Sequence, residues 1–594
     1  MTITRWSRVA LWFPAIFGTA ALLMLVLSMI STNLNFDEAY NLQVVNSMVG
    51  ARTYASYGVL DGLGPWPFDP HVTTGVPAMV SVSLGWWVSG GELMGVRVVM
   101  LGWLGVYVWG CLRLLRPNCQ VRYRQFQQLL VCAPVLIIGF EDLGDFRGEL
   151  PASALAILAL LALDRRRFVL AGAFSALAAL TKLVLAPLIP LVIIGVFSAS
   201  ARGGARNVSR AFGGALGVVL MHEAFRMVTV GGWLEYQISI VELRSFVHRQ
   251  RIPASVSWYS RGVLAERWDS LLQLATPGFF VFMTVVAAFA VMASRDFRRR
   301  SIGGASVVPL MVGVVLAPIM LLGWAVQSKA TYSAQILPAL LVAGPAAVIL
   351  SLRGAGASRI LTLSVLSCSA VLLAAPGGLR LDLDPLSPRQ HALRDELAHM
   401  EVGLLFSNGW YQSPVLQLLL GIPAVPWPAE GQVMVVGLTS GLDHSGEVVP
   451  PGPDAPWSPS EICGERFVVG DVELCHVRSG LQSNYSHPAV VNWGERTTDA
   501  GHVPNPQVDG QAGFWVVVDS ESRVALSPLR LRIEGRALRG TEVSLDGDLL
   551  TALAPPMLFD DVGQLTAELE NLDTGRITPL GTIDVVATGP RNQD

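Results

Sequence analysis

Apolar runs of about 15 to 23 residues recur between residues 9 and 376, and clusters of arginine separate alternate pairs of them. A helix needs roughly 20 apolar residues to cross the hydrocarbon core of a bilayer. The chain is 52% hydrophobic and only 15% charged, which is too apolar for a soluble enzyme of this length. The pattern therefore predicts an α-helical polytopic membrane protein with a water-exposed part.

The arginine clusters set the expected orientation, because positive residues concentrate in cytoplasmic loops. The first apolar run follows the basic residues 1–8 and is too long for a signal peptide, so we expect a retained helix with a cytoplasmic N-terminus. All clusters then lie inside, provided that the run Gly75–Gly90 does not cross. Its glycines, proline and paired Trp86 and Trp87 are typical of a helix in the membrane interface.

With that choice about eleven transmembrane helices are predicted. They fall at about 9–30, 92–112, 126–140, 150–163, 167–181, 183–199, 209–229, 272–293, 303–325, 335–352 and 359–376. An odd number of crossings places everything after Pro376 outside the cell membrane.

The composition changes near residue 380 to Pro, Gly, Asp and strand-like segments. We expect three domains: a membrane domain at 1–380, an extracytoplasmic α/β module at 381–483 and a β-sandwich-like domain at 484–594. The α/β reading rests on a helical pattern at 391–400 and short buried strands at 402–406 and 433–436. The sandwich reading rests on strand-like runs at 514–518, 529–533 and 583–587.

Cysteines divide between the two regions. Cys111, Cys119, Cys132 and Cys368 lie in or near predicted spans and are interpreted as apolar fillers. Cys463 and Cys475 lie outside, where an oxidising environment favours a disulfide over a zinc pair, since no CxxC motif accompanies them.

The acidic pair Asp37 and Glu38 follows the first predicted span directly. Charge beside a bilayer is costly, so such a pair is a candidate functional site, although an ordinary polar loop has the same appearance. Two further outer loops are rich in charge: 141–149, with Asp142, Asp145, Arg147 and Glu149, and about 230–270. The sequence thus predicts polar groups gathered on one outer face.

The motifs Phe36–Asn41, Gly50–Ala55, Asp69–Gly75 and Ala179–Lys182 resemble the GT-C class of integral membrane glycosyltransferases. This class includes protein O-mannosyltransferases and the aminoarabinose transferases of lipid A, and the resemblance covers about residues 1–376. It implies a polyprenyl-phosphate-linked sugar as donor and transfer on the extracytoplasmic side of a bacterial cytoplasmic membrane. The acceptor would be a cell-envelope glycan, lipid or protein.

The resemblance also suggests roles for individual residues. Asp37 matches the acid of the family motif and is the candidate general base for the acceptor hydroxyl, while Glu38 would orient the acceptor or help to hold a metal. The lipid phosphate that leaves needs positive charge or hydrogen-bond donors. Candidates for binding donor or substrate are Arg147, Glu149, Lys182, Arg244, His248, Arg249, Arg251 and Arg261.

No cofactor is firmly predicted. A divalent metal stays open, with Asp69, His71, Asp142 and Asp145 as weak candidate ligands. His222 and Glu223 lie inside a predicted span, where internal pairing is the simpler interpretation.

Two other classes of function compete. One is a transporter or flippase of a lipid-linked sugar, although the chain lacks the internal repeat typical of transporters. The other is a membrane-anchored envelope binding or assembly protein, whose C-terminal units do the work. A net charge of −3 without a basic tail provides no footprint for nucleic acid.

Overall fold

The computed structural model describes most of the helical half of the chain and the secondary structure of the C-terminal part. The longer described stretches are 36–50, 74–118, 124–137, 146–200, 203–229, 307–324 and 336–352. Shorter pieces lie within 20–34, 52–57, 65–67, 232–240, 283–286 and 363–366. After residue 387 the described parts are 388–400, 417–418 and the strands between 405 and 585.

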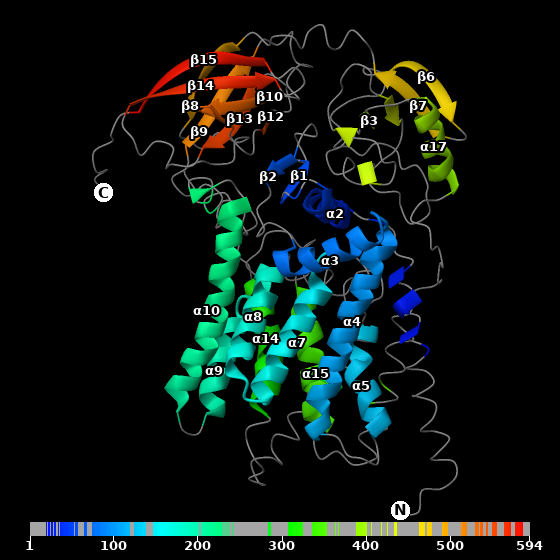
Figure 1. Ribbon diagram of the computed structural model, residues 1–594, viewed down its shortest axis with the longest axis vertical. Helices are drawn as coiled ribbons and strands as arrows, with labels where there is room; N and C mark the ends of the chain where they lie inside the picture. The colour runs from blue at the N-terminus through cyan, green and yellow to red at the C-terminus, as the bar shows by residue number, and fades with distance from the viewer. Residues whose placement is uncertain are drawn as a thin grey trace, which may run out of the picture.

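The apolar runs form a bundle of helices that lie alongside one another (Figure 1). The described bundle helices are α4 (Leu93–Leu115), α5 (Arg124–Ile137), α7 (Glu149–Asp164), α8 (Phe168–Thr181), α9 (Leu188–Ala199), α10 (Gly204–Thr229), α14 (Val308–Trp324) and α15 (Leu337–Leu352). Their positions agree with the predicted runs to within a few residues.

Helix length is where the structure departs from the expectation. Within the described residues, α4 and α10 are long and apolar enough to cross a membrane, whereas the other apolar helices have 10 to 17 residues. The predicted spans at 9–30, 272–293 and 359–376 fall largely outside the described residues. The described helices therefore support two candidate spans and do not support eleven full-length crossings.

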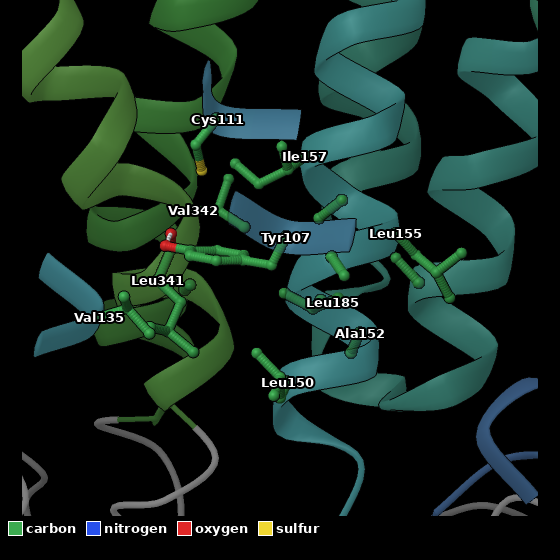
Figure 2. Close-up of a cluster of buried hydrophobic side chains, with 14 of the residues drawn as sticks. Tyr107, Cys111, Val135, Leu150, Ala152, Leu155, Ile157, Leu185, Leu341 and Val342 are labelled. Atoms are coloured by element: carbon green, nitrogen blue, oxygen red, sulfur yellow. Dashed lines mark hydrogen bonds between the residues drawn. The ribbon is translucent and has the colours of Figure 1, made fainter. Parts of the chain in front are cut away.

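Helix α7 lies at the centre of the bundle. Nearly all of its side chains are buried, as expected of a helix that is hydrophobic all round. Figure 2 shows one part of this core, where Tyr107 of α4 lies among aliphatic side chains and Cys111. The Tyr107 hydroxyl donates a 2.7 Å hydrogen bond to the carbonyl of Leu341, which joins α4 to α15.

Small residues allow α8 and α10 to pack closely. A Cβ atom added at Gly172 would lie 1.9 Å from the carbonyl oxygen of Ala211, and one at Gly214 would lie 2.2 Å from that of Val169. Without side chains at these two positions, the backbones approach as small-residue interfaces in membranes do. This pairing holds the lower part of α10 against the bundle.

Three short elements cover one end of the bundle (Figure 1). They are helix α2 (Phe36–Gly50), helix α3 (Val76–Val88) and a hairpin of β1 (Ala55–Tyr57) with β2 (Pro65–Pro67). Helix α3 occupies the run expected to lie in the interface, and it lies across the bundle rather than along it. Met79, Val82 and Trp86 face inward, whereas Leu84 and Trp87 are exposed.

The part beyond residue 387 begins with helix α17 (Pro388–His399) and a five-stranded mixed sheet in the order β4-β3-β5-β7-β6. Its strands are β3 (Leu405–Phe406), β4 (Ala424–Val425), β5 (Val433–Val435), β6 (Cys463–Val469) and β7 (Val472–Val477). The sheet contains the predicted disulfide, which joins Cys463 of β6 to Cys475 of β7.

The last part forms two antiparallel sheets of four strands, in the orders β12-β13-β9-β8 and β11-β10-β14-β15. The strands are β8 (Val490–Arg496), β9 (Ala512–Val518), β10 (Leu529–Ile533), β11 (Arg536–Ala537), β12 (Glu542–Val543), β13 (Leu549–Ala554), β14 (Gly563–Asn571) and β15 (Arg576–Val585). The three strand-like runs found in the sequence coincide with parts of β9, β10 and β15. The expected domain boundaries near 380 and 483 lie outside the described residues.

Candidate functional site

Helix α2 carries the acidic pair in its first turn, where carboxylates interact favourably with the positive end of the helix dipole. Successive helical residues point about 100° apart, so two neighbouring acids cannot share one environment. Asp37 is exposed, whereas Glu38 is fully buried. The fold thus separates the two carboxylates that the sequence presents together.

Glu38 is held from two other elements. Its carboxylate forms a two-pronged ion pair with Arg97 of α4, with 2.9 Å between Oε2 and the Nη2 donor, and the second contact joins Nη1 to Oε1. Oε1 also accepts a 2.9 Å hydrogen bond from the backbone N–H of Phe146. This corrects the expectation that Glu38 touches the acceptor or a metal, because its oxygens lie inside the protein and face these donors.

Asn41 continues the buried side of α2 one turn after Glu38, at the spacing that places two residues on one helix face. Its Nδ2 donates to Thr74 Oγ1 at 3.1 Å and to the carbonyl oxygen of Phe146 at 2.8 Å. The N–H and the C=O of Phe146 are therefore both bound by α2. These contacts fix the start of α7 against the helix that carries Asp37.

The segment before α7 also meets the end of α8. Lys182 Nζ lies 2.9 Å from Glu149 Oε1, and the lysine side chain is 20% exposed. Between them, Gly148 has φ +89°, and a Cβ there would lie 2.8 Å from Thr74 Cγ2 and 3.2 Å from Lys182 Cε. Only glycine suits both this backbone and this space. Three sequence-predicted residues, Arg147, Glu149 and Lys182, thus lie in adjoining segments around Thr74.

Two buried acceptor atoms in this cluster have no hydrogen-bond partner among the described residues. They are Oδ1 of Asn41 and Oε2 of Glu149. Buried polar atoms are normally satisfied, and those that are not tend to mark functional sites, ligands or water. Both atoms lie within the junction of α2, the start of α7 and the end of α8.

The remaining predicted site residues lie outside the described part of the chain. These are Arg244, His248, Arg249, Arg251 and Arg261 among the donor-binding candidates, and Asp69, His71, Asp142 and Asp145 among the metal candidates. Within the described residues, no group of three or more His, Cys, Asp or Glu side chains is arranged to hold a metal.

Charge is distributed unequally between the two ends of the bundle. Arg97, near the start of α4, pairs with Glu38 of the acidic pair, whereas Arg113 and Arg116 lie at the other end of this helix. The connection between α7 and α8 at the same far end holds the arginines 165–167. The described structure thus has an acidic and mixed-charge end formed by α2 and its neighbours, and an arginine-rich end opposite.

Sequence reasoning missed Arg97, Asn41 and Thr74. Arg97 had a signal, because a charged residue inside an apolar run is expensive and implies a partner. Asn41 and Thr74 had none beyond their place in the motifs, since their roles depend on contacts across 33 and 105 residues of sequence.

Neither the known protein-family models nor the curated protein sequences contain a match to this chain.

Proposed function

We propose that the chain is a bacterial membrane glycosyltransferase of the GT-C type, which transfers a sugar from a polyprenyl-phosphate-linked donor to a cell-envelope acceptor. Asp37 is the general base. The observation that carries this proposal is the exposed carboxylate of Asp37 on a helix whose buried, adjacent side is held by the contacts of Glu38 with Arg97 and Phe146. A base must be accessible to substrate and also rigidly held.

The reaction needs few protein groups. Asp37 takes the proton of the acceptor hydroxyl as that oxygen forms a bond to the anomeric carbon of the sugar. The bond from this carbon to the phosphate oxygen breaks, and the lipid phosphate leaves with both electrons of that bond. A phosphate leaving group needs no strong acid, but nearby positive charge stabilises it.

Lys182 is our candidate for that charge among the described residues. It is partly exposed and pairs with Glu149, so an arriving phosphate would share or replace this carboxylate as its partner. Arg147 is half-buried in the segment before α7, beside the same cluster. Glu38 and Arg97 act as positioning residues in this scheme, because they hold α2 without contacting substrate.

The short helices support a polytopic arrangement in which the site is recessed. A 14-residue helix such as α8 extends about 21 Å, less than the ~30 Å hydrocarbon core. Irregular backbone is tolerated at membrane depth only where protein buries it or a water-filled cavity is present. Phe146 and Gly148, which precede α7, and Leu185, in the 3-10 turn that follows α8, are buried at the site end, which suits helices that stop below an outer cavity.

The role of Asp37 as general base is tested by measuring sugar transfer in membranes that contain the Asp37→Asn variant. A panel of polyprenyl-phosphate sugars serves as donors, and each is assayed with and without chelator. Loss of a general base slows transfer by about 10²- to 10⁴-fold. Glu92→Gln is the matched control, because Glu92 is another exposed acid near the same end and should be dispensable.

Full activity of Asp37→Asn would show that Asp37 is not the base. If the unchanged protein transfers no sugar from any donor, yet moves or binds a lipid-linked sugar, the transporter or assembly class replaces this proposal.

A further inference from the structure

A polar cluster occupies the last turns of α10, away from the Asp37 network. Glu223 receives contacts from both directions along the helix, with 3.3 Å from Oε1 to His222 Nδ1 and 3.4 Å from Oε2 to Arg226 Nη1. His222 and Arg226 are buried, whereas the Glu223 side chain is 24% exposed. Such a cluster is unusual on a helix that is otherwise apolar enough to span a membrane.

The chain reverses after α10 and adds two aromatic residues to this cluster. Gly232 has φ +129°, a conformation that favours glycine, and its N–H donates to the carbonyl of Met227 at 3.0 Å. The reversal brings Tyr236 back to the helix, where its hydroxyl donates to Glu223 Oε2 at 2.8 Å. The Arg226 guanidinium carbon lies 5.2 Å from the centre of the Tyr236 ring.

Trp233 stacks on Tyr236 from the outer side. The two rings are 5.7 Å apart with an interplanar angle of 24°, and Trp233 is 62% exposed. One face of the indole is thus supported by a ring that Glu223 and Arg226 hold in place, while much of the tryptophan stays accessible. The partly exposed Glu223 carboxylate lies at the hydroxyl end of Tyr236 and fixes the position of that ring.

This combination suits a carbohydrate better than a lipid chain. The negative face of an aromatic ring attracts the polarised C–H groups of a sugar ring, and the exposed face of Trp233 is held in a fixed orientation by Tyr236. A tryptophan that only anchors the protein in the membrane interface needs no stacking partner that is itself held by a carboxylate and a guanidinium group.

The cluster lies at the same end of the bundle as the acidic pair. Phe225 of α10 packs edge-on against Tyr54, with 5.6 Å between ring centres, and Tyr54 immediately precedes β1 in the segment that follows α2. In Figure 1 the upper end of α10 and the β1–β2 hairpin both lie at the end of the bundle that faces the C-terminal sheets.

We infer that Trp233 and Tyr236 form a carbohydrate-binding platform, supported by Glu223 and Arg226, which holds one sugar ring of a glycan acceptor. The inference that the platform binds carbohydrate does not depend on the proposed function, whereas its role as an acceptor subsite rests on the proposed glycosyltransferase function.

Binding of soluble hexose and pentose oligosaccharides to the purified full-length protein tests the platform by titration calorimetry. We expect Trp233→Ala to weaken binding by about tenfold, as loss of a central aromatic contact does. Trp233→Phe should retain most of the affinity, because it keeps a stacking ring. Trp87→Ala is the matched control, since Trp87 is an equally exposed tryptophan on α3, at 67%.

Equal affinity of Trp233→Ala and the unchanged protein would overturn the platform, as would an equal loss in Trp87→Ala or the absence of oligosaccharide binding. The two proposals fail separately. If Trp233→Ala loses oligosaccharide binding and the unchanged protein transfers no sugar, the platform is supported and the glycosyltransferase proposal is refuted. If sugar transfer depends on Asp37 but Trp233→Ala leaves the KM for the acceptor unchanged, the glycosyltransferase proposal is supported and the role of the platform as an acceptor subsite is refuted.

Discussion

Replacing Arg97 by methionine should destabilise the bundle more than any other change of a single charge near the site. Arg97 is 1% exposed and Glu38 is fully buried, so the substitution leaves a carboxylate inside the protein without its cation. Methionine fills a similar volume and packs well, which keeps the loss of packing small. The expected loss of stability therefore comes mainly from removing the positive partner of the buried Glu38 carboxylate.

The magnitude follows from the geometry. Breaking a buried ion pair by removing one partner costs about 3–5 kcal/mol. Because Glu38 keeps the hydrogen bond from the N–H of Phe146, we expect the lower end of that range, about 3 kcal/mol. Adding Glu38→Gln removes the second charge while keeping an acceptor for Phe146, so the double variant should recover at least about 1 kcal/mol.

Thermal unfolding in detergent, followed by tryptophan fluorescence, measures these differences across the four members of the cycle. Arg116→Met is the matched control, because Arg116 is exposed at the opposite end of α4 and should have little effect. The reasoning would be refuted if Arg97→Met unfolded at the same temperature as the unchanged protein. It would also be refuted if the double variant were no more stable than Arg97→Met alone.

Two further predictions concern backbone constraints. Gly148→Ala should lower the unfolding temperature clearly more than Gly90→Ala. Both glycines have positive φ, which strains alanine by about 1–2 kcal/mol, but only at Gly148 does the added Cβ collide with Thr74, since at Gly90 it meets nothing within 4 Å. Equal losses would show that crowding by Thr74 is unimportant. Replacing Cys463 and Cys475 together by serine should destabilise the five-stranded sheet by about 3 kcal/mol through loop entropy and make it the first region cut in limited proteolysis; an unchanged cleavage pattern would contradict this.

Much of the helical fold was accessible from the sequence because hydrophobic length is a local property. Runs predicted at 92–112, 150–163 and 167–181 became α4, α7 and α8 with small shifts at their ends. The number of crossings was not accessible in this way. Helix ends depend on whether neighbouring segments bury the next residues, as they do for Phe146 and Leu185.

The candidate site was found only in outline. Asp37, Glu149 and Lys182 were predicted as site residues from their positions at the outer ends of apolar runs, and the structure gathers their segments at one end of the bundle. The roles of Glu38 and Arg97 could not be predicted, because their contact spans 59 residues and depends on how α2 lies against α4.

By itself, the sequence determined that apolar helices dominate the first part of the chain, that arginine gathers at one end of them, and that an acidic pair opens the segment at the other end. These properties depend on composition and spacing along the chain. Tertiary structure alone decided which acid of the pair is exposed, which cation holds the other, and that Tyr236 returns to Glu223. Each of these outcomes depends on the angle and depth at which one element packs on another, which no local pattern encodes.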